Sequence, residues 1–93
     1  MKIIWDEEKA AKLLATRDIS FEEIAQIIIE QKYLEILENS SHPEQMIFLV
    51  KYKEYIHVVP FIIDDENTII LKTVFPSRKF QKLYGEKNEK NKA

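Results

Sequence analysis

The 93-residue chain contains no cysteine and only one glycine, Gly85. Without cysteine it can form no disulfide and offers no thiolate ligand, and its two histidines are too few for a convincing zinc site. With one glycine it cannot build a Walker loop or a dinucleotide-binding fingerprint, which excludes the ATP and NAD chemistry of those motifs. We therefore expect neither a metal nor a cofactor.

Long apolar runs are also missing. The longest is 58–63, whereas a helix that crosses a bilayer needs about 18 apolar residues. The N-terminus turns acidic at Asp6 and lacks the apolar stretch and cleavage site of a secretory signal. We expect a cytoplasmic protein without membrane contact.

The chain has 45% hydrophobic residues and a mass of 11.1 kDa, which favours one packed core and is too small for two. Residues 86–93 contain no apolar residue except the terminal Ala93, so they have nothing to bury. We expect a single domain at 1–85 and a disordered, charged tail at 86–93.

Charge is distributed unevenly along the chain. Residues 1–71 carry 7 basic and 14 acidic side chains, whereas residues 72–93 carry 7 basic and 2 acidic ones. The net charge of -2 is therefore -7 in the first part plus +5 in the last. A basic segment on an acidic protein can attract a polyanion locally.

Capping residues and apolar spacing predict two helices near the N-terminus, after a short strand at 2–5. Asp6 can cap the first helix, which should end near Arg17-Asp18. Ser20 and Glu23 form a capping box for the second, which should end around 31–32. The apolar stripe of that second helix consists of Phe21, Ile24, Ala25 and Ile28.

Strand-like runs follow at 34–38, 46–52, 55–63 and 68–75. Residues 53–54 should form a tight turn although they lack the preferred Asn-Gly pair. Pro60 has no N–H for the sheet ladder, so a bulge or a sheet edge is expected there. Ser77 can cap a last helix at 78–84, which Gly85 ends.

The order β-α-α-β-β-β-β-α predicts an α+β domain. In it, the two N-terminal helices pack on one face of a mainly antiparallel sheet.

Cations and aromatic residues near the end of the chain are the main candidates for chemistry. If strand ends meet, Lys72 and Arg78 share a concave basic surface, where Arg78 could bind two phosphate oxygens at once. Lysines at strand ends more often only keep a protein in solution. The sequence favours a structural strand residue over a catalyst for His57, and packing over base stacking for Phe80, Leu83 and Tyr84. The full set is Lys51, Tyr52, Lys53, His57, Lys72, Arg78, Lys79, Lys82 and Tyr84.

Several segments resemble BrnT-type toxins of type II toxin-antitoxin systems over residues 3 to about 84. They are Trp5-Asp6 before a lysine-bearing helix, the segment at 19–24, the histidine loop and strand at 42–48, the strand at 58–61, Leu71-Lys72-Thr73 and the segment at 76–79. A typical member has an arginine in the last strand, where this chain has Val74.

The resemblance implies a compact RelE-like fold and a metal-independent endoribonuclease. It also implies inhibition by a cognate antitoxin, commonly a small DNA-binding protein. Such a toxin can form a homo-oligomer, or a hetero-oligomer with its antitoxin. In such a nuclease the RNA's own 2′-hydroxyl attacks the adjacent phosphate.

Roles at the expected RNA site follow from side-chain chemistry. Lys72 and Arg78 would hold the scissile phosphate, and His42 or His57 would move a proton. The residues expected to bind flanking phosphates are Lys51, Lys53, Lys79, Lys82 and Tyr84.

Two other functions stay open at this point. The chain could be a non-enzymatic interaction module, or a degenerate toxin that only binds its partner, with a strand-accepting sheet edge near Pro60. A stand-alone DNA-binding domain ranks lowest, because no helix combines surface basicity with a turn-linked partner helix.

Overall fold

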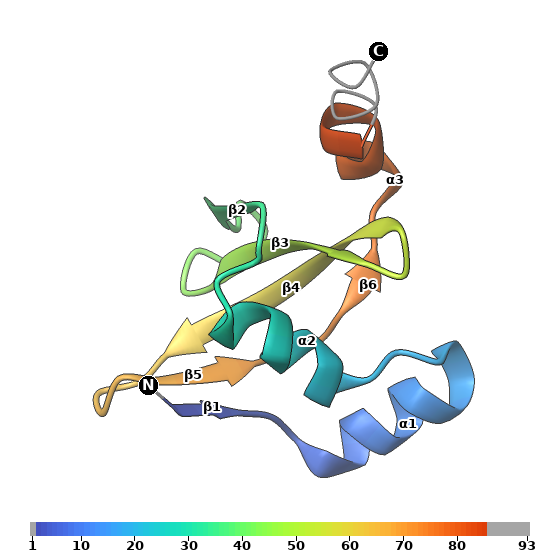
Figure 1. The fold of residues 1–93 in the computed structure, drawn as a ribbon. Helices are drawn as coiled ribbons and strands as arrows, with labels where there is room; N and C mark the ends of the chain where they lie inside the picture. Colours follow the sequence, from blue (N-terminus) through green and yellow to red (C-terminus); the bar gives the residue numbers. More distant parts are fainter. Residues whose placement is uncertain (1, 86–93) are drawn as a thin grey trace.

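The computed structural model describes residues 2–85, which form an α+β fold with a mixed six-stranded sheet and three helices (Figure 1). The strands are β1 (Lys2–Ile4), β2 (Glu35–Glu38), β3 (Met46–Tyr52), β4 (Tyr55–Ile63), β5 (Thr68–Leu71) and β6 (Phe75–Pro76). The helices are α1 (Glu7–Arg17), α2 (Phe21–Ile29) and the short α3 (Arg78–Phe80), which continues as one π-helical turn at Gln81–Gly85. The tail expected at 86–93 lies outside the described residues.

The strand order is β1-β5-β4-β3-β2. The short β6 also pairs with β4, nearer the beginning of that strand than β5 does. β1 runs parallel to β5, while all other pairs are antiparallel. The predicted α+β class and the mainly antiparallel sheet are confirmed. The strand expected at 68–75 is divided into β5 and β6, because residues 72–74 form no strand pair, although the Lys72 N–H still donates to the Pro60 carbonyl.

Both N-terminal helices begin at the predicted caps. The Asp6 carboxylate accepts the backbone N–H groups of Glu8 and Lys9, and the Ser20 hydroxyl accepts that of Glu23. α2 ends at Ile29, earlier than expected, and Gln31 follows with a positive φ of 57°.

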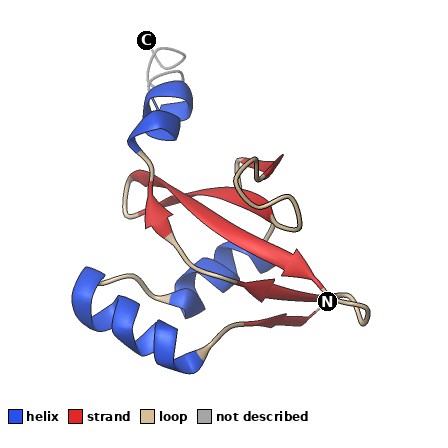
Figure 2. Ribbon diagram, turned by 180° about the vertical axis from the view of Figure 1, so that it is seen from behind, coloured by secondary structure: helices blue, strands red, loops and turns tan. Residues whose placement is uncertain are grey.

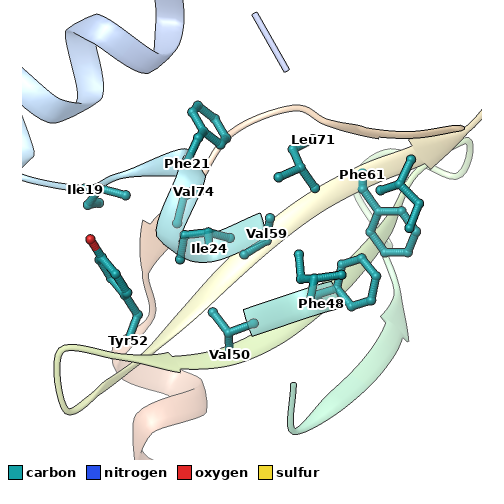
Figure 3. Packing of buried hydrophobic residues seen from close by; sticks show 12 residues of the cluster. Ile19, Phe21, Ile24, Phe48, Val50, Tyr52, Val59, Phe61, Leu71 and Val74 are labelled. Carbon is teal, nitrogen blue, oxygen red and sulfur yellow. The ribbon is translucent and has the colours of Figure 1, made fainter. Parts of the chain in front are cut away.

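Each face of the sheet has its own apolar cluster. On one face, the α2 side chains Phe21 and Ile24 pack over Phe48, Val59 and Phe61 (Figure 3). The predicted stripe of α2 is buried as expected. α1 has no fully buried residue and contributes only the partly buried Ala10 and Leu13.

The opposite face is covered only in part. Its buried residues are Ile47, Leu49, Ile56 and Val58, with Phe80 and Tyr84 of the C-terminal helical segment packed against them. In the view from behind, α2 lies beyond the sheet and α1 lies beside it rather than across it (Figure 2).

The turn between β3 and β4 is as short as predicted. Lys53 and Glu54 both have positive φ, 52° and 64°, as a two-residue turn between twisted strands requires.

Pro60 causes the bulge that the sequence predicts, but the edge expected there is wrong. Phe61 pairs with Leu71 and Val58 with Phe75, so three steps along β4 match four along the neighbouring segment. One extra residue is therefore inserted opposite Pro60. β4 is bordered by β3 on its other side, so no free edge exists at Pro60.

Candidate functional site

A groove of about 520 Å³ lies on the sheet face opposite α2. Its apolar lining consists of Ile47, Val58, Pro60, Phe75 and Phe80, and its polar lining of Lys9, Asn39, Ser41, His42, Gln45, Lys72, Thr73 and Ser77. We call this site the polar groove. Its residues come from α1, the 39–45 loop, the strands β3 and β4 and the segment at 72–80.

The polar groove is cationic, although the protein as a whole is acidic. Lys9 and Lys72 contribute positive charge, and His42 is a side chain of the type that exchanges protons near neutral pH. The chain has 16 acidic residues, yet none of them is among the described residues that line this groove. Such a lining is suited to an anion with both charge and hydrogen-bonding oxygens.

His42 is held in the groove wall by a loop with its own hydrogen bonds. The Asn39 side chain accepts the Ser41 N–H at 3.1 Å and donates to the Gln45 side chain at 3.2 Å. The His42 N–H donates to the Asn39 carbonyl at 3.2 Å, and the Gln45 N–H to the His42 carbonyl at 2.8 Å. These bonds fold the loop back on itself and hold the backbone from which the exposed imidazole extends.

The bulge opposite Pro60 decides which side chains of the 72–75 segment line the groove. Lys72, Thr73 and Phe75 line it, whereas Val74 is 1% exposed in the core on the α2 side. The side chain at position 74 therefore does not face the groove.

His57 lies on the other face of the sheet from His42 and Lys72. It pairs with Val50 in the register of β3 and β4, and is 6% exposed. Its ring meets that of Tyr52 edge to face at 5.3 Å, and its Nδ1 lies 3.0 Å from the Tyr55 carbonyl oxygen. The structural alternative for His57 fits this environment, and the structure does not bring it to the groove.

Neither Lys51, near the end of β3, nor Lys53, in the turn that follows it, lines the groove. Lys51 is four residues beyond Ile47, or about 13 Å along an extended strand, and its Nζ lies 3.6 Å from the Glu54 carboxylate. Lys53 donates to the Asp18 carboxylate at 2.8 Å and to the Asp18 carbonyl. Hydrogen bonding to Asp18 raises the pKa of Lys53.

The C-terminal candidates also lie outside the groove lining. Arg78, Lys79 and Lys82 are exposed, and the Lys79 ammonium lies 5.4 Å from the centre of the Phe80 ring. Tyr84 packs against the apolar cluster on the sheet face opposite α2, which agrees with the packing role considered for it from the sequence. Leu83, for which packing was also considered, is 50% exposed.

The groove cation that the sequence did not reveal is Lys9. Its Nζ donates to the backbone carbonyl of Lys72 at 2.9 Å, across 63 positions of sequence. Lysine is common on helix surfaces, and nothing in the spacing of α1 indicates that its first turn lies beside the bulge. The missing N–H of Pro60 is the only sequence signal for this contact.

A second cavity, of about 530 Å³, lies on the α2 side of the sheet. Its lining is mostly apolar and includes Ile29, Met46 and Ile63, which are 59%, 40% and 50% exposed.

Within residues 2–85, no three His, Asp or Glu side chains are grouped as a metal site would require. No helix in that same range is long and apolar enough to cross a membrane. Comparison of the chain with protein-family models, with curated proteins and with solved structures gave no match.

Proposed function

We propose that this chain is a BrnT-type toxin with a RelE-like fold, an endoribonuclease of the cytoplasm that a cognate antitoxin neutralises. The observation that carries this proposal is the polar groove, where Lys9, Lys72 and His42 line one cavity without an acidic residue. RNA phosphates carry the charge that such a lining would stabilise. The resemblance noted in the sequence supplies the reaction class.

The reaction is a transesterification that needs no group beyond the protein and the RNA. The 2′-hydroxyl oxygen attacks the adjacent phosphorus and gives its proton to a base, while the bond to the 5′-oxygen breaks. The leaving oxygen takes a proton, so the products are a 2′,3′-cyclic phosphate and a 5′-hydroxyl end. Catalysis then depends on in-line positioning, charge stabilisation and proton transfer.

The groove offers a side chain for each of these tasks. Lys72 and Lys9 bind the non-bridging phosphate oxygens and stabilise the extra negative charge of the transition state. His42 moves the proton, and its exposed position on the 39–45 loop leaves it accessible to RNA. Phe75, which is 41% exposed in the groove wall, offers a surface on which a base can stack.

Arg78 and His57 have no role at the scissile phosphate in this proposal. Arg78 follows Ser77, which lines the groove, so its guanidinium could bind the RNA backbone beyond the cleavage point.

A cleavage assay tests the proposal directly. Purified protein is incubated with labelled RNA in EDTA, and Lys72→Met and His42→Gln are compared with Lys79→Met. Lys79 is the matched control because it is an exposed lysine of the same segment that does not line the groove.

Wild type should cleave the RNA, and Lys72→Met should lose on the order of a hundredfold in rate, as after removal of one oxyanion donor. His42→Gln should also be slow, and Lys79→Met should cleave like wild type. An inactive wild type, or an equal loss in Lys79→Met, contradicts the assignment. In cells, induced expression should arrest growth, and co-expression of the cognate antitoxin should relieve the arrest.

The second candidate function is a non-enzymatic interaction module, which includes a degenerate toxin that only binds its partner. The apolar cavity on the α2 side favours it, because exposed apolar side chains such as Ile29 and Ile63 commonly mark protein contacts. A module of this kind would neither cleave RNA nor arrest growth, so the same experiments separate the two functions.

A further inference from the structure

Pro60 leaves one backbone carbonyl of the sheet without its usual donor. In an antiparallel ladder, two residues of a hydrogen-bonded pair exchange both N–H groups. The Lys72 N–H donates to the Pro60 carbonyl at 2.8 Å, but proline has no N–H to return to the Lys72 carbonyl. This carbonyl lies in the middle of the sheet, at the bulge.

The Lys72 carbonyl accepts the Lys9 ammonium group instead, with an Nζ to oxygen distance of 2.9 Å. Lys9 is in the first turn of α1, a helix without a fully buried residue. The contact places the ammonium group at the Lys72 backbone, and both lysines line the groove.

An ammonium group has three N–H donors, and the Lys72 carbonyl uses one of them. Two donors remain for a ligand, with the charge intact. A lysine fixed in this way loses less side-chain entropy on binding than a free one, because its conformation is already restricted.

We propose that Pro60 is a positioning residue that, by leaving the Lys72 carbonyl free, holds Lys9 in the polar groove as a phosphate-binding cation. This inference rests on the proposed function and adds to it the residue that positions the Lys9 ammonium group. The competing explanation is that the contact only ties α1 to the sheet.

The test gives the sheet its missing donor. Pro60→Ala introduces an N–H that can pair with the Lys72 carbonyl and so displace the Lys9 ammonium. Lys9→Met removes the cation itself. Lys12→Met is the matched control, because Lys12 is an exposed lysine of the same helix that does not line the groove.

Two quantities are measured for each variant. The first is binding of a 2′-O-methylated RNA oligonucleotide, which cannot be cleaved, over a range of salt concentrations. The second is the NMR signal of the Lys9 side chain, which shows whether its ammonium is held. Melting temperatures, recorded alongside, verify that each variant is folded.

Pro60→Ala and Lys9→Met should each weaken binding about tenfold, and each should lower the slope of log affinity against log salt by about 0.7, the value for one phosphate contact on a single strand. The double variant should be no weaker than Lys9→Met alone, and Lys12→Met should bind like wild type. A purely structural contact would leave the salt slope unchanged.

The possible results distinguish a failure of the inference from a failure of the ribonuclease proposal. If Pro60→Ala releases Lys9 but binds with wild-type affinity and slope, or if Lys9 stays held in Pro60→Ala, the inference is wrong while the ribonuclease proposal stands. If wild type binds the probe with the expected ranking but cleaves no RNA, the inference stands and the ribonuclease proposal fails. If wild type does not bind the probe, both are wrong.

Discussion

Tyr52 joins the central sheet to the beginning of α2 through its hydroxyl group. The hydroxyl oxygen accepts the Ser20 N–H at 3.1 Å, and the hydroxyl donates to the Glu23 carboxylate at 2.9 Å. Figure 3 shows the oxygen pointing away from the strand, toward the segment at Ile19. Tyr52→Phe therefore removes both hydrogen bonds and keeps the packing of the ring.

The expected loss in the free energy of unfolding comes mainly from the Ser20 N–H, which is part-buried and loses its acceptor. An unsatisfied buried donor costs about 1–3 kcal/mol, and the exposed Glu23 can turn to water at little cost. We therefore expect the free energy of unfolding to fall by about 1.5 kcal/mol. For a domain of this size, such a loss lowers the melting temperature by roughly 6–12 °C.

The pH dependence of this loss is a second test of the same contact. Burial raises the pKa of the Tyr52 hydroxyl above the usual value of roughly 10. Because the folded protein holds this proton more tightly than the unfolded chain does, the raised pKa stabilises the folded state fully at pH values below the usual pKa. This stabilisation is lost as the pH rises through the raised pKa of the folded state. The difference between wild type and Tyr52→Phe should thus be constant from pH 6 to 9 and shrink at higher pH.

Urea unfolding followed by circular dichroism measures both effects. Tyr55→Phe is the matched control, because Tyr55 is opposite Tyr52 in the hairpin and its hydroxyl has no hydrogen bond within residues 2–85. The reasoning is refuted if Tyr52→Phe costs less than about 0.5 kcal/mol at pH 7, if Tyr55→Phe costs as much, or if the difference does not change above pH 10.

Two further changes test the core on the α2 side of the sheet and the cap of α3. Phe48→Ala removes a ring that stacks on Phe61 at 4.1 Å and should lower the free energy of unfolding by about 3–5 kcal/mol; a loss below about 1 kcal/mol in urea would contradict the core described here. Ser77→Ala removes the hydroxyl that accepts the Phe80 N–H at 3.2 Å, which costs about 1 kcal/mol at a helix cap. Amide hydrogen exchange at Phe80 should then become faster, and unchanged protection would show that the cap does not hold α3.

Much of the fold was predictable because local chemistry and global packing agree in this chain. Asp6 and Ser20 cap helices as their residue types favour, and the apolar stripe of α2 is buried where its spacing places it. Pro60 correctly indicated a bulge, since a missing donor has the same effect in any sheet. Its position in the middle of the sheet was not predictable, because strand order depends on contacts between distant segments.

The candidate site was less predictable, and the reason is the sheet itself. Alternation along β4 puts His57 on one face and Val58 on the other, and sequence alone does not say which face is open. Lys72 and His42 were expected at the site and line one groove, whereas Lys9 reaches it only through the bulge. A residue placed by backbone geometry elsewhere in the chain leaves little trace in its own local sequence.

We propose that the polar groove binds an RNA phosphodiester backbone. The most direct test is an amide NMR titration of the wild-type chain with the uncleavable RNA oligonucleotide at low salt. We predict that the largest shift changes fall in the 39–45 loop, at 72–77 and around Lys9. Changes confined to the α2 side of the sheet or to Arg78–Gly85, or no saturable change at all, would contradict the account.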